Sequence, residues 1–123
     1  METHIRVVIA EDDHFAVTAL QRYLSGAHSI EVVGIAHDGR QALQVTQELQ
    51  PDVLITDLIM PQLDGIEVTR RVLAEGLMCR VLIFTAMADE TTMIKALEAG
   101  ATGLIPEETI EPLTQIDSLA DVE

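Results

Sequence analysis

The sequence is poor in aromatic and basic residues. Two Phe, one Tyr and no Trp occur among 123 residues, whereas apolar residues make up 48% of the chain, so the core must be aliphatic. Seven Lys and Arg against 21 Asp and Glu give a formal net charge of −14, which repels phosphate backbones and anionic lipid. Direct binding to nucleic acid or to a membrane is therefore not expected.

Cysteine is scarce and long apolar runs are absent. Cys79 is the only cysteine, which excludes an internal disulfide, a thiolate metal site and a Cys-x-x-Cys redox motif. Apolar stretches such as residues 81–88 are too short to cross a bilayer, and residues 1–4 do not open a signal peptide. We expect a soluble cytoplasmic protein with a single domain over residues 1–123.

Strand and helix patterns alternate along the chain. Short apolar runs rich in β-branched residues predict strands, and apolar residues at three- and four-residue spacing between them predict helices. Asp38-Gly39 and Asp64-Gly65 stand where helices should begin, and Ala99-Gly100 where one should end. Strands that are apolar on both faces predict a parallel sheet covered by helices, a doubly wound (βα)5 architecture of the α/β class. The predicted strands are residues 5–10, 30–36, 53–56, 81–85 and 102–105.

Acidic residues follow two of these strands. Glu11, Asp12 and Asp13 follow the first, and Asp57 follows the third. Ligand sites of doubly wound sheets lie outside the carboxyl ends of the strands, so these carboxylates should converge. A divalent cation relieves their repulsion, and a set of oxygen ligands favours Mg²⁺ over Zn²⁺. His14 is expected to face solvent at the start of the first helix.

Each of these residues also has an ordinary structural explanation. Residues 11–13 could form an acidic N-cap and first helical turn, and Asp57 could form an Asx turn at the end of its strand. Thr85 could simply close the fourth strand as a β-branched residue. The presence of two separate acidic segments at one edge of the predicted sheet argues for a site.

Residues 57–65, Asp-Leu-Ile-Met-Pro-Gln-Leu-Asp-Gly, resemble the phosphoacceptor loop of response-regulator receivers, Asp-x-x-Met-Pro-x-x-Asp-Gly. The acidic pair Glu11 and Asp12 and the strand-ending Thr85 match the same family. The similarity covers residues 5 to about 106 and is strongest to receivers that precede LuxR-type helix-turn-helix domains. It implies a flavodoxin-like receiver fold with a five-stranded parallel sheet.

The resemblance also implies roles for individual residues. Asp57 would accept a phosphoryl group from a phosphohistidine of a sensor histidine kinase. Mg²⁺ would be held by Asp12, Asp57, the backbone carbonyl of Ile59 and, through water, Glu11, and Thr85 would bind the phosphoryl oxygens as part of a switch. Such a domain signals and is not an enzyme, beyond catalysing its own phosphorylation and dephosphorylation.

The sequence departs from the family after the fifth strand, where receivers carry a Lys. Counting without gaps puts Glu107 at that position, whereas alignment on Pro106 puts Ile105 there. Leu104 replaces the usual aromatic switch residue, and the only lysine, Lys95, is expected to be a solvated charge on the fourth helix. Without the cation the phosphorylated site is more negative, so we expect slower phosphorylation or weaker coupling to the loops.

The missing Lys supports an alternative, a pseudo-receiver that is an interaction module regulated without phosphorylation. Asp57, Glu11, Asp12 and Thr85 argue against it. A haloacid dehalogenase-like phosphatase would need an Asp where this chain has Ile59. A flavodoxin-like cofactor carrier would need a phosphate loop after the first strand, and this chain has none.

Residues 107–123 carry six acidic and no basic side chains. A helix is predicted from about residue 111. In the family the last helix often joins the fourth in a dimer interface, so a homodimer is a possible partner relation. A DNA-binding output domain beyond residue 123 is a second possible partner.

Overall fold

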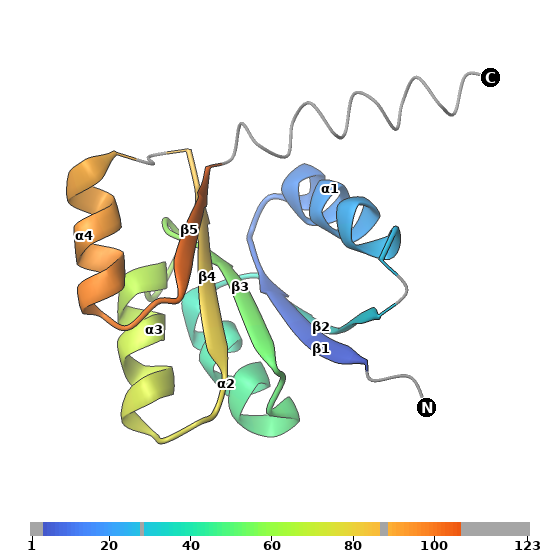
Figure 1. Cartoon of the computed structure of the whole chain (residues 1–123), viewed down its shortest axis with the longest axis horizontal. Helices are drawn as coiled ribbons and strands as arrows, with labels where there is room; N and C mark the ends of the chain where they lie inside the picture. Colours follow the sequence, from blue (N-terminus) through green and yellow to red (C-terminus); the bar gives the residue numbers. More distant parts are fainter. Residues whose placement is uncertain (1–3, 28, 87–88, 107–123) are drawn as a thin grey trace.

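One parallel sheet organises the molecule, with the strand order β2-β1-β3-β4-β5 (Figure 1). The computed structural model describes residues 4–27, 29–86 and 89–106. This arrangement confirms the predicted doubly wound receiver fold, with four helices among the described residues. The elements are β1 (Ile5–Ala10), α1 (His14–Ser25), β2 (Ile30–Ala36), α2 (Gly39–Leu49), β3 (Val53–Asp57), α3 (Gly65–Ala74), β4 (Arg80–Thr85), α4 (Glu90–Glu98) and β5 (Gly103–Pro106).

The strands agree closely with their predicted ranges. β1 and β2 have the predicted bounds, whereas β3 continues one residue further and includes Asp57. β4 begins one residue earlier than predicted, and β5 is displaced by one residue so that it includes Pro106. The acidic residue that was expected just after the third strand is therefore held by strand pairing, opposite Phe84 of β4.

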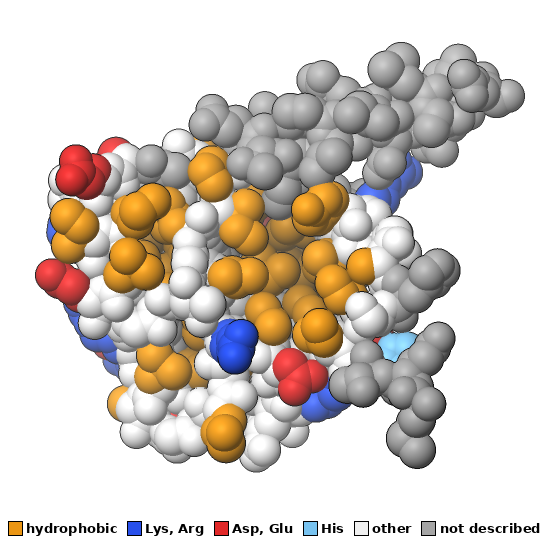
Figure 2. Space-filling model, in the orientation of Figure 1, with side chains coloured by type: hydrophobic (Ala, Val, Ile, Leu, Met, Phe, Trp, Pro, Cys, Tyr) orange, Lys and Arg blue, Asp and Glu red, His pale blue; other side chains and the backbone are white. Residues whose placement is uncertain are grey.

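Two apolar layers lie on opposite faces of the sheet. α1 covers one face, and α2, α3 and α4 cover the other (Figure 1). Figure 2 shows apolar side chains gathered on the face of the sheet beside α1, where Val53, Leu82 and Ile105 are only partly buried. No helix of the described residues is long and apolar enough to span a membrane. The helix predicted from about residue 111 lies outside the described residues.

Each of the four described helices begins at an aspartate. The carboxylate of each aspartate accepts a hydrogen bond from a backbone N–H of the first helical turn, which would otherwise lack a partner. The acidic character of this edge is thus partly structural, since these side chains serve as caps. The pairs are Asp13 with Phe15, Asp38 with Gln41, Asp64 with Glu67, and Asp89 with Thr92.

Two glycines let α2 and α3 begin close to the loop after β3. A Cβ atom at Gly39 would overlap the backbone carbonyl of Leu63, and one at Gly65 would overlap the carbonyl of Asp57. Neither glycine has a positive φ. Glycine is therefore required at these two positions because there is no room for a side chain, and not because of the backbone conformation. The close contacts fix the loop after β3 against both helices.

Candidate functional site

The acidic site is assembled by the pairing of β1 with β3. Ala10 pairs with Thr56, so the residues that follow them, Glu11 and Asp57, lie at the same edge of the sheet. One ligand oxygen from each of Glu11, Asp12 and Asp57 lies within 4.8 Å of the others. Among the described residues this is the only such group of three potential metal ligands. The predicted convergence of carboxylates is therefore confirmed for Glu11, Asp12 and Asp57, whereas Asp13 does not belong to the group.

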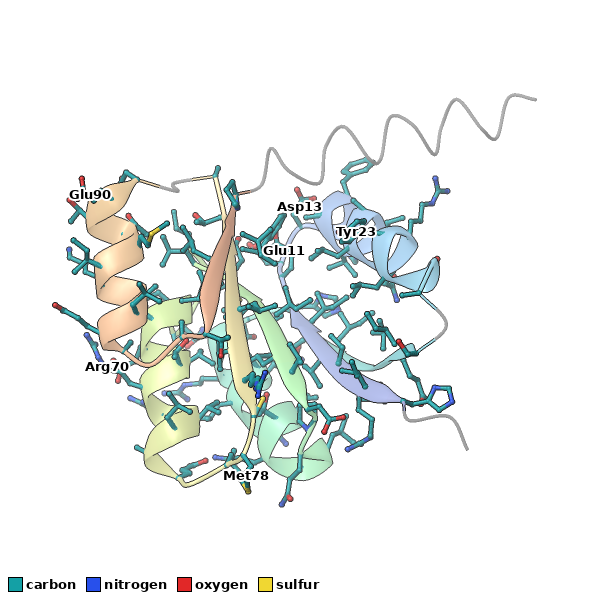
Figure 3. All side chains as sticks on the ribbon, viewed as in Figure 1. Glu11, Asp13, Tyr23, Arg70, Met78 and Glu90 are labelled. Atoms are coloured by element: carbon teal, nitrogen blue, oxygen red, sulfur yellow. The ribbon has the colours of Figure 1, made fainter. Side chains whose placement is uncertain are left out.

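The third residue of the acidic segment, Asp13, has a different role. Figure 3 shows Glu11 and Asp13 on the segment that joins β1 to α1. The Asp13 carboxylate accepts the backbone N–H of Phe15 at 3.0 Å, so the N-cap explanation holds for Asp13. Of the three acidic residues after β1, only Glu11 and Asp12 therefore belong to the acidic group. His14 is exposed at the first position of α1, as predicted.

Burial favours the protonated form of Glu11. Glu11 is only 4% exposed, and this burial, together with the hydrogen bond and the charge repulsion from Asp57, raises the pKa of Glu11 to about 9. Burial also raises the pKa of Asp57, although hydrogen bonds from Glu11 and from the backbone of Ile59 and Leu58 oppose that rise. A proton on Glu11 at neutral pH would lie where the neighbouring Asp57 carboxylate can accept it in a hydrogen bond.

Backbone hydrogen bonds fix the loop after Asp57. The Leu58 N–H donates to the Phe84 carbonyl at 3.2 Å, and the Gly39 N–H donates to the Pro61 carbonyl at 3.1 Å. These bonds tie the loop to β4 and to the start of α2. Gln62 adopts a positive φ of 76°, which the sequence did not signal because the residue is neither Gly nor Asn. The backbone of Ile59 is thereby held beside Asp57, while its side chain is 61% exposed.

The neighbouring strands place the predicted switch residues. Thr85 is buried at the end of β4, and Leu104 packs against the core layer of α2, α3 and α4. Pro106 pairs with Thr85 within the sheet, while Ile105 packs in the layer on the α1 side. Pro106 is the last described residue of this part of the chain, and Glu107 lies outside the described residues, so the choice between Glu107 and Ile105 for the family's lysine position stays a prediction.

Lys95 is exposed on α4, as predicted. It lines a surface hollow together with Ile59 and Asp64. Its side chain thus lies beside the loop that follows Asp57, on the side of α3 and α4.

Comparison with known proteins identifies the family. The response regulator receiver domain family matches residues 7–113. The chain is 42% identical, over 85% of its own length and 30% of the relative's, to protein-glutamate methylesterase/protein-glutamine glutaminase 5 of Myxococcus xanthus. It is 34% identical to the transcriptional regulatory protein LiaR of Bacillus subtilis, over 79% of the chain and 46% of LiaR. The receiver domain of the response regulator NarL from Mycobacterium tuberculosis superposes with a TM-score of 0.84 at 32% identity, covering 94% of this chain and 96% of that one.

The chain therefore belongs to the response regulator receiver domain family, and it is a signalling module of the two-component type. The family resemblance and the fold predicted from the sequence are both confirmed. The chain spans less than half the length of the two curated relatives named above. Their enzymatic or regulatory activities are thus properties of longer proteins.

The raised pKa of Glu11 makes the stability of the protein depend on pH. Between the ordinary pKa of a glutamate, 4.5, and about 9, the folded state retains a proton on Glu11 that the unfolded chain has released. The free energy of unfolding should therefore fall as pH rises through this window. Urea denaturation in the presence of a chelator, repeated across the window, should show a smaller fall for Glu11→Gln.

Asp13→Asn is the matched control, because Asn also caps helices and Asp13 lies outside the acidic group. It should follow the wild-type pH dependence. Parallel curves for wild type and Glu11→Gln would show that Glu11 does not carry the proton.

Proposed function

We propose that residues 1–123 form a receiver domain in which Asp57 accepts a phosphoryl group from a phosphohistidine of a sensor histidine kinase. The observation that carries this proposal is the convergence of the Glu11, Asp12 and Asp57 carboxylates at the start of the loop that matches the family pattern. An aspartate held at a buried edge, with a fixed loop behind it, is equipped to act as a nucleophile toward phosphorus.

The residues of the site fit Mg²⁺. All the donors are oxygens, and Mg²⁺ prefers a few carboxylates completed by water. The carboxylates of Asp12 and Asp57 and the backbone carbonyl of Ile59 would bind the ion directly, and Glu11 through water. When bound, Mg²⁺ neutralises charge on the carboxylates and on the phosphoryl oxygens. Because the metal-free pair holds a proton, binding of the ion requires its release.

The chain's own residues carry out the transfer. A carboxylate oxygen of Asp57 bonds to phosphorus while the P–N bond of the phosphohistidine breaks and its electron pair returns to the imidazole nitrogen. The product is an acyl phosphate on Asp57. Thr85, buried at the end of the neighbouring strand, would donate its hydroxyl to a phosphoryl oxygen and draw its loop inward, with Leu104 responding beside it on β5. The domain thus catalyses only its own phosphorylation and, by hydrolysis of the acyl phosphate, its own dephosphorylation.

Partners and location follow from the same proposal. We propose a sensor histidine kinase as phosphoryl donor, a cytoplasmic location, and a DNA-binding output region beyond residue 123. The relative LiaR is named a transcriptional regulatory protein, which supports the proposed output. Self-association is a further partner relation that the family resemblance supports.

The pseudo-receiver alternative gains no support from the described site or from the matched relatives. A pseudo-receiver has no need to keep a buried, protonated carboxyl pair, since burial of such groups costs stability. Phosphorylation of Asp57 distinguishes a receiver from a pseudo-receiver.

Incubation with acetyl phosphate and Mg²⁺ tests the acceptor. Intact mass spectrometry should show one phosphoryl adduct on the wild type and none on Asp57→Asn, because the amide cannot form an acyl phosphate. Asp13→Asn removes a nearby carboxylate outside the acidic group and should retain the adduct. An adduct that persists in Asp57→Asn would place the acceptor elsewhere, and no adduct on the wild type would favour the pseudo-receiver.

Restoring a cation at position 107 tests the charge argument. Glu107→Lys should raise the rate of phosphorylation by roughly tenfold, which corresponds to about 1.4 kcal/mol of added transition-state stabilisation. Glu108→Lys makes the same change in net charge one residue later and should have a smaller effect. Equal rates for Glu107→Lys and wild type, followed by mass spectrometry over time, would contradict the argument.

A further inference from the structure

Two histidines face each other at the carboxyl edge of the sheet. The ring centroids of His14 and His37 are 5.6 Å apart, with an angle of 53° between the ring planes. Both side chains are exposed. Neither residue belongs to the acidic group of the proposed phosphorylation site, although both lie at the same edge of the sheet.

Strand pairing brings the two imidazoles together from separate parts of the sequence. Ala10 of β1 pairs with Ala36 of β2, and the Glu11 N–H donates to the Ala36 carbonyl at 2.9 Å. His37 follows Ala36 directly, and His14 opens α1. The two connections therefore leave adjacent strands side by side.

The backbone at both positions is held before any ligand binds. The His37 N–H donates to the side-chain oxygen of Gln41 at 2.7 Å, and the carboxylate of Asp38 caps α2. The carboxylate of Asp13 caps α1 immediately before His14. The backbone is thus already ordered at His14, the first residue of α1, and at His37, next to the N-cap of α2, so binding of one ion by both imidazoles would require little further backbone ordering.

The spacing suits joint coordination of a metal ion. Zn–N bonds of about 2.0–2.1 Å at tetrahedral angles place two ligating nitrogens roughly 3.4 Å apart. Imidazoles with centroids 5.6 Å apart reach that separation when their nitrogen-bearing edges turn toward each other. No third protein ligand converges on them among the described residues, so water would fill the remaining positions. The negative charge of the adjacent caps Asp13 and Asp38 favours a cation there.

We propose that His14 and His37 form a second metal site, a two-imidazole clamp for a borderline divalent transition metal such as Zn²⁺. Nitrogen donors select this class of ion, whereas the carboxylates of Glu11, Asp12 and Asp57 select Mg²⁺. A bound ion would join the start of α1 to the connection between β2 and α2. The inference rests on the histidine geometry and not on phosphorylation of Asp57.

Zinc titration of the full chain in excess Mg²⁺ tests the site, because Mg²⁺ occupies the oxygen ligands. NMR of the histidine rings should show the His14 and His37 signals moving together, with no movement of His4. Loss of an outer-shell partner already lowers metal affinity by roughly 10–100-fold, so His14→Ala and His37→Ala should each weaken zinc binding at least tenfold by calorimetry. His4→Ala, at the opposite end of β1, is the matched control and should bind zinc as the wild type does.

Three outcomes would overturn the proposal. One is an unchanged zinc affinity in both histidine variants, and another is a titration in which neither the His14 nor the His37 ring signal moves. The third is zinc binding that Asp57→Asn abolishes, because this would place the ion in the acidic group. His14→Gln and His37→Gln repeat the test with side chains of similar size, and the ring signals of the wild type report on the site without any substitution.

Discussion

The receiver depends on one electrostatic constraint, the confinement of three carboxylates at the carboxyl edge of a parallel sheet. Glu11 and Asp57 meet because β1 and β3 pair in one register, and the ligand oxygens of the group lie within 4.8 Å of one another. Like charges at this distance, with Glu11 buried, cannot all ionise without a counter-charge. Burial first, and then the hydrogen bond and the charge of Asp57, raise the pKa of Glu11 to about 9, which favours its protonated form at neutral pH.

The surrounding structure holds this acidic group in place. The loop after Asp57 is bonded to β4 through Leu58 and to α2 through Gly39. The neighbouring acids at this edge, such as Asp13 and Asp38, are satisfied as helix caps and add no ligand to the group. Capping carboxylates and those of the acidic group therefore lie within a few residues of each other. Both kinds accept backbone N–H groups, but Glu11 and Asp57 also interact with another carboxyl.

Much of this arrangement could be predicted from the sequence. β-branched runs located the strands to within one residue, and Asp-Gly pairs located the starts of α2 and α3, because these signals are local. The meeting of Glu11 with Asp57 was predictable because strand ends of parallel sheets share one edge. The contact of His14 with His37 was missed, although the exposure of His14 was predicted, because it depends on the register of β1 against β2. The positive φ of Gln62 was missed as well, since no residue type announces it there.

The most direct measurement of the central claim is calorimetry of Mg²⁺ binding in buffers with different ionisation enthalpies. If Glu11 and Asp57 share a proton that the ion displaces, the observed enthalpy at neutral pH should vary with the buffer in proportion to the protons released, and this variation should largely disappear in Glu11→Gln. Mg²⁺ binding whose enthalpy is the same in every buffer would contradict the protonated pair. Absence of Mg²⁺ binding would contradict the site itself.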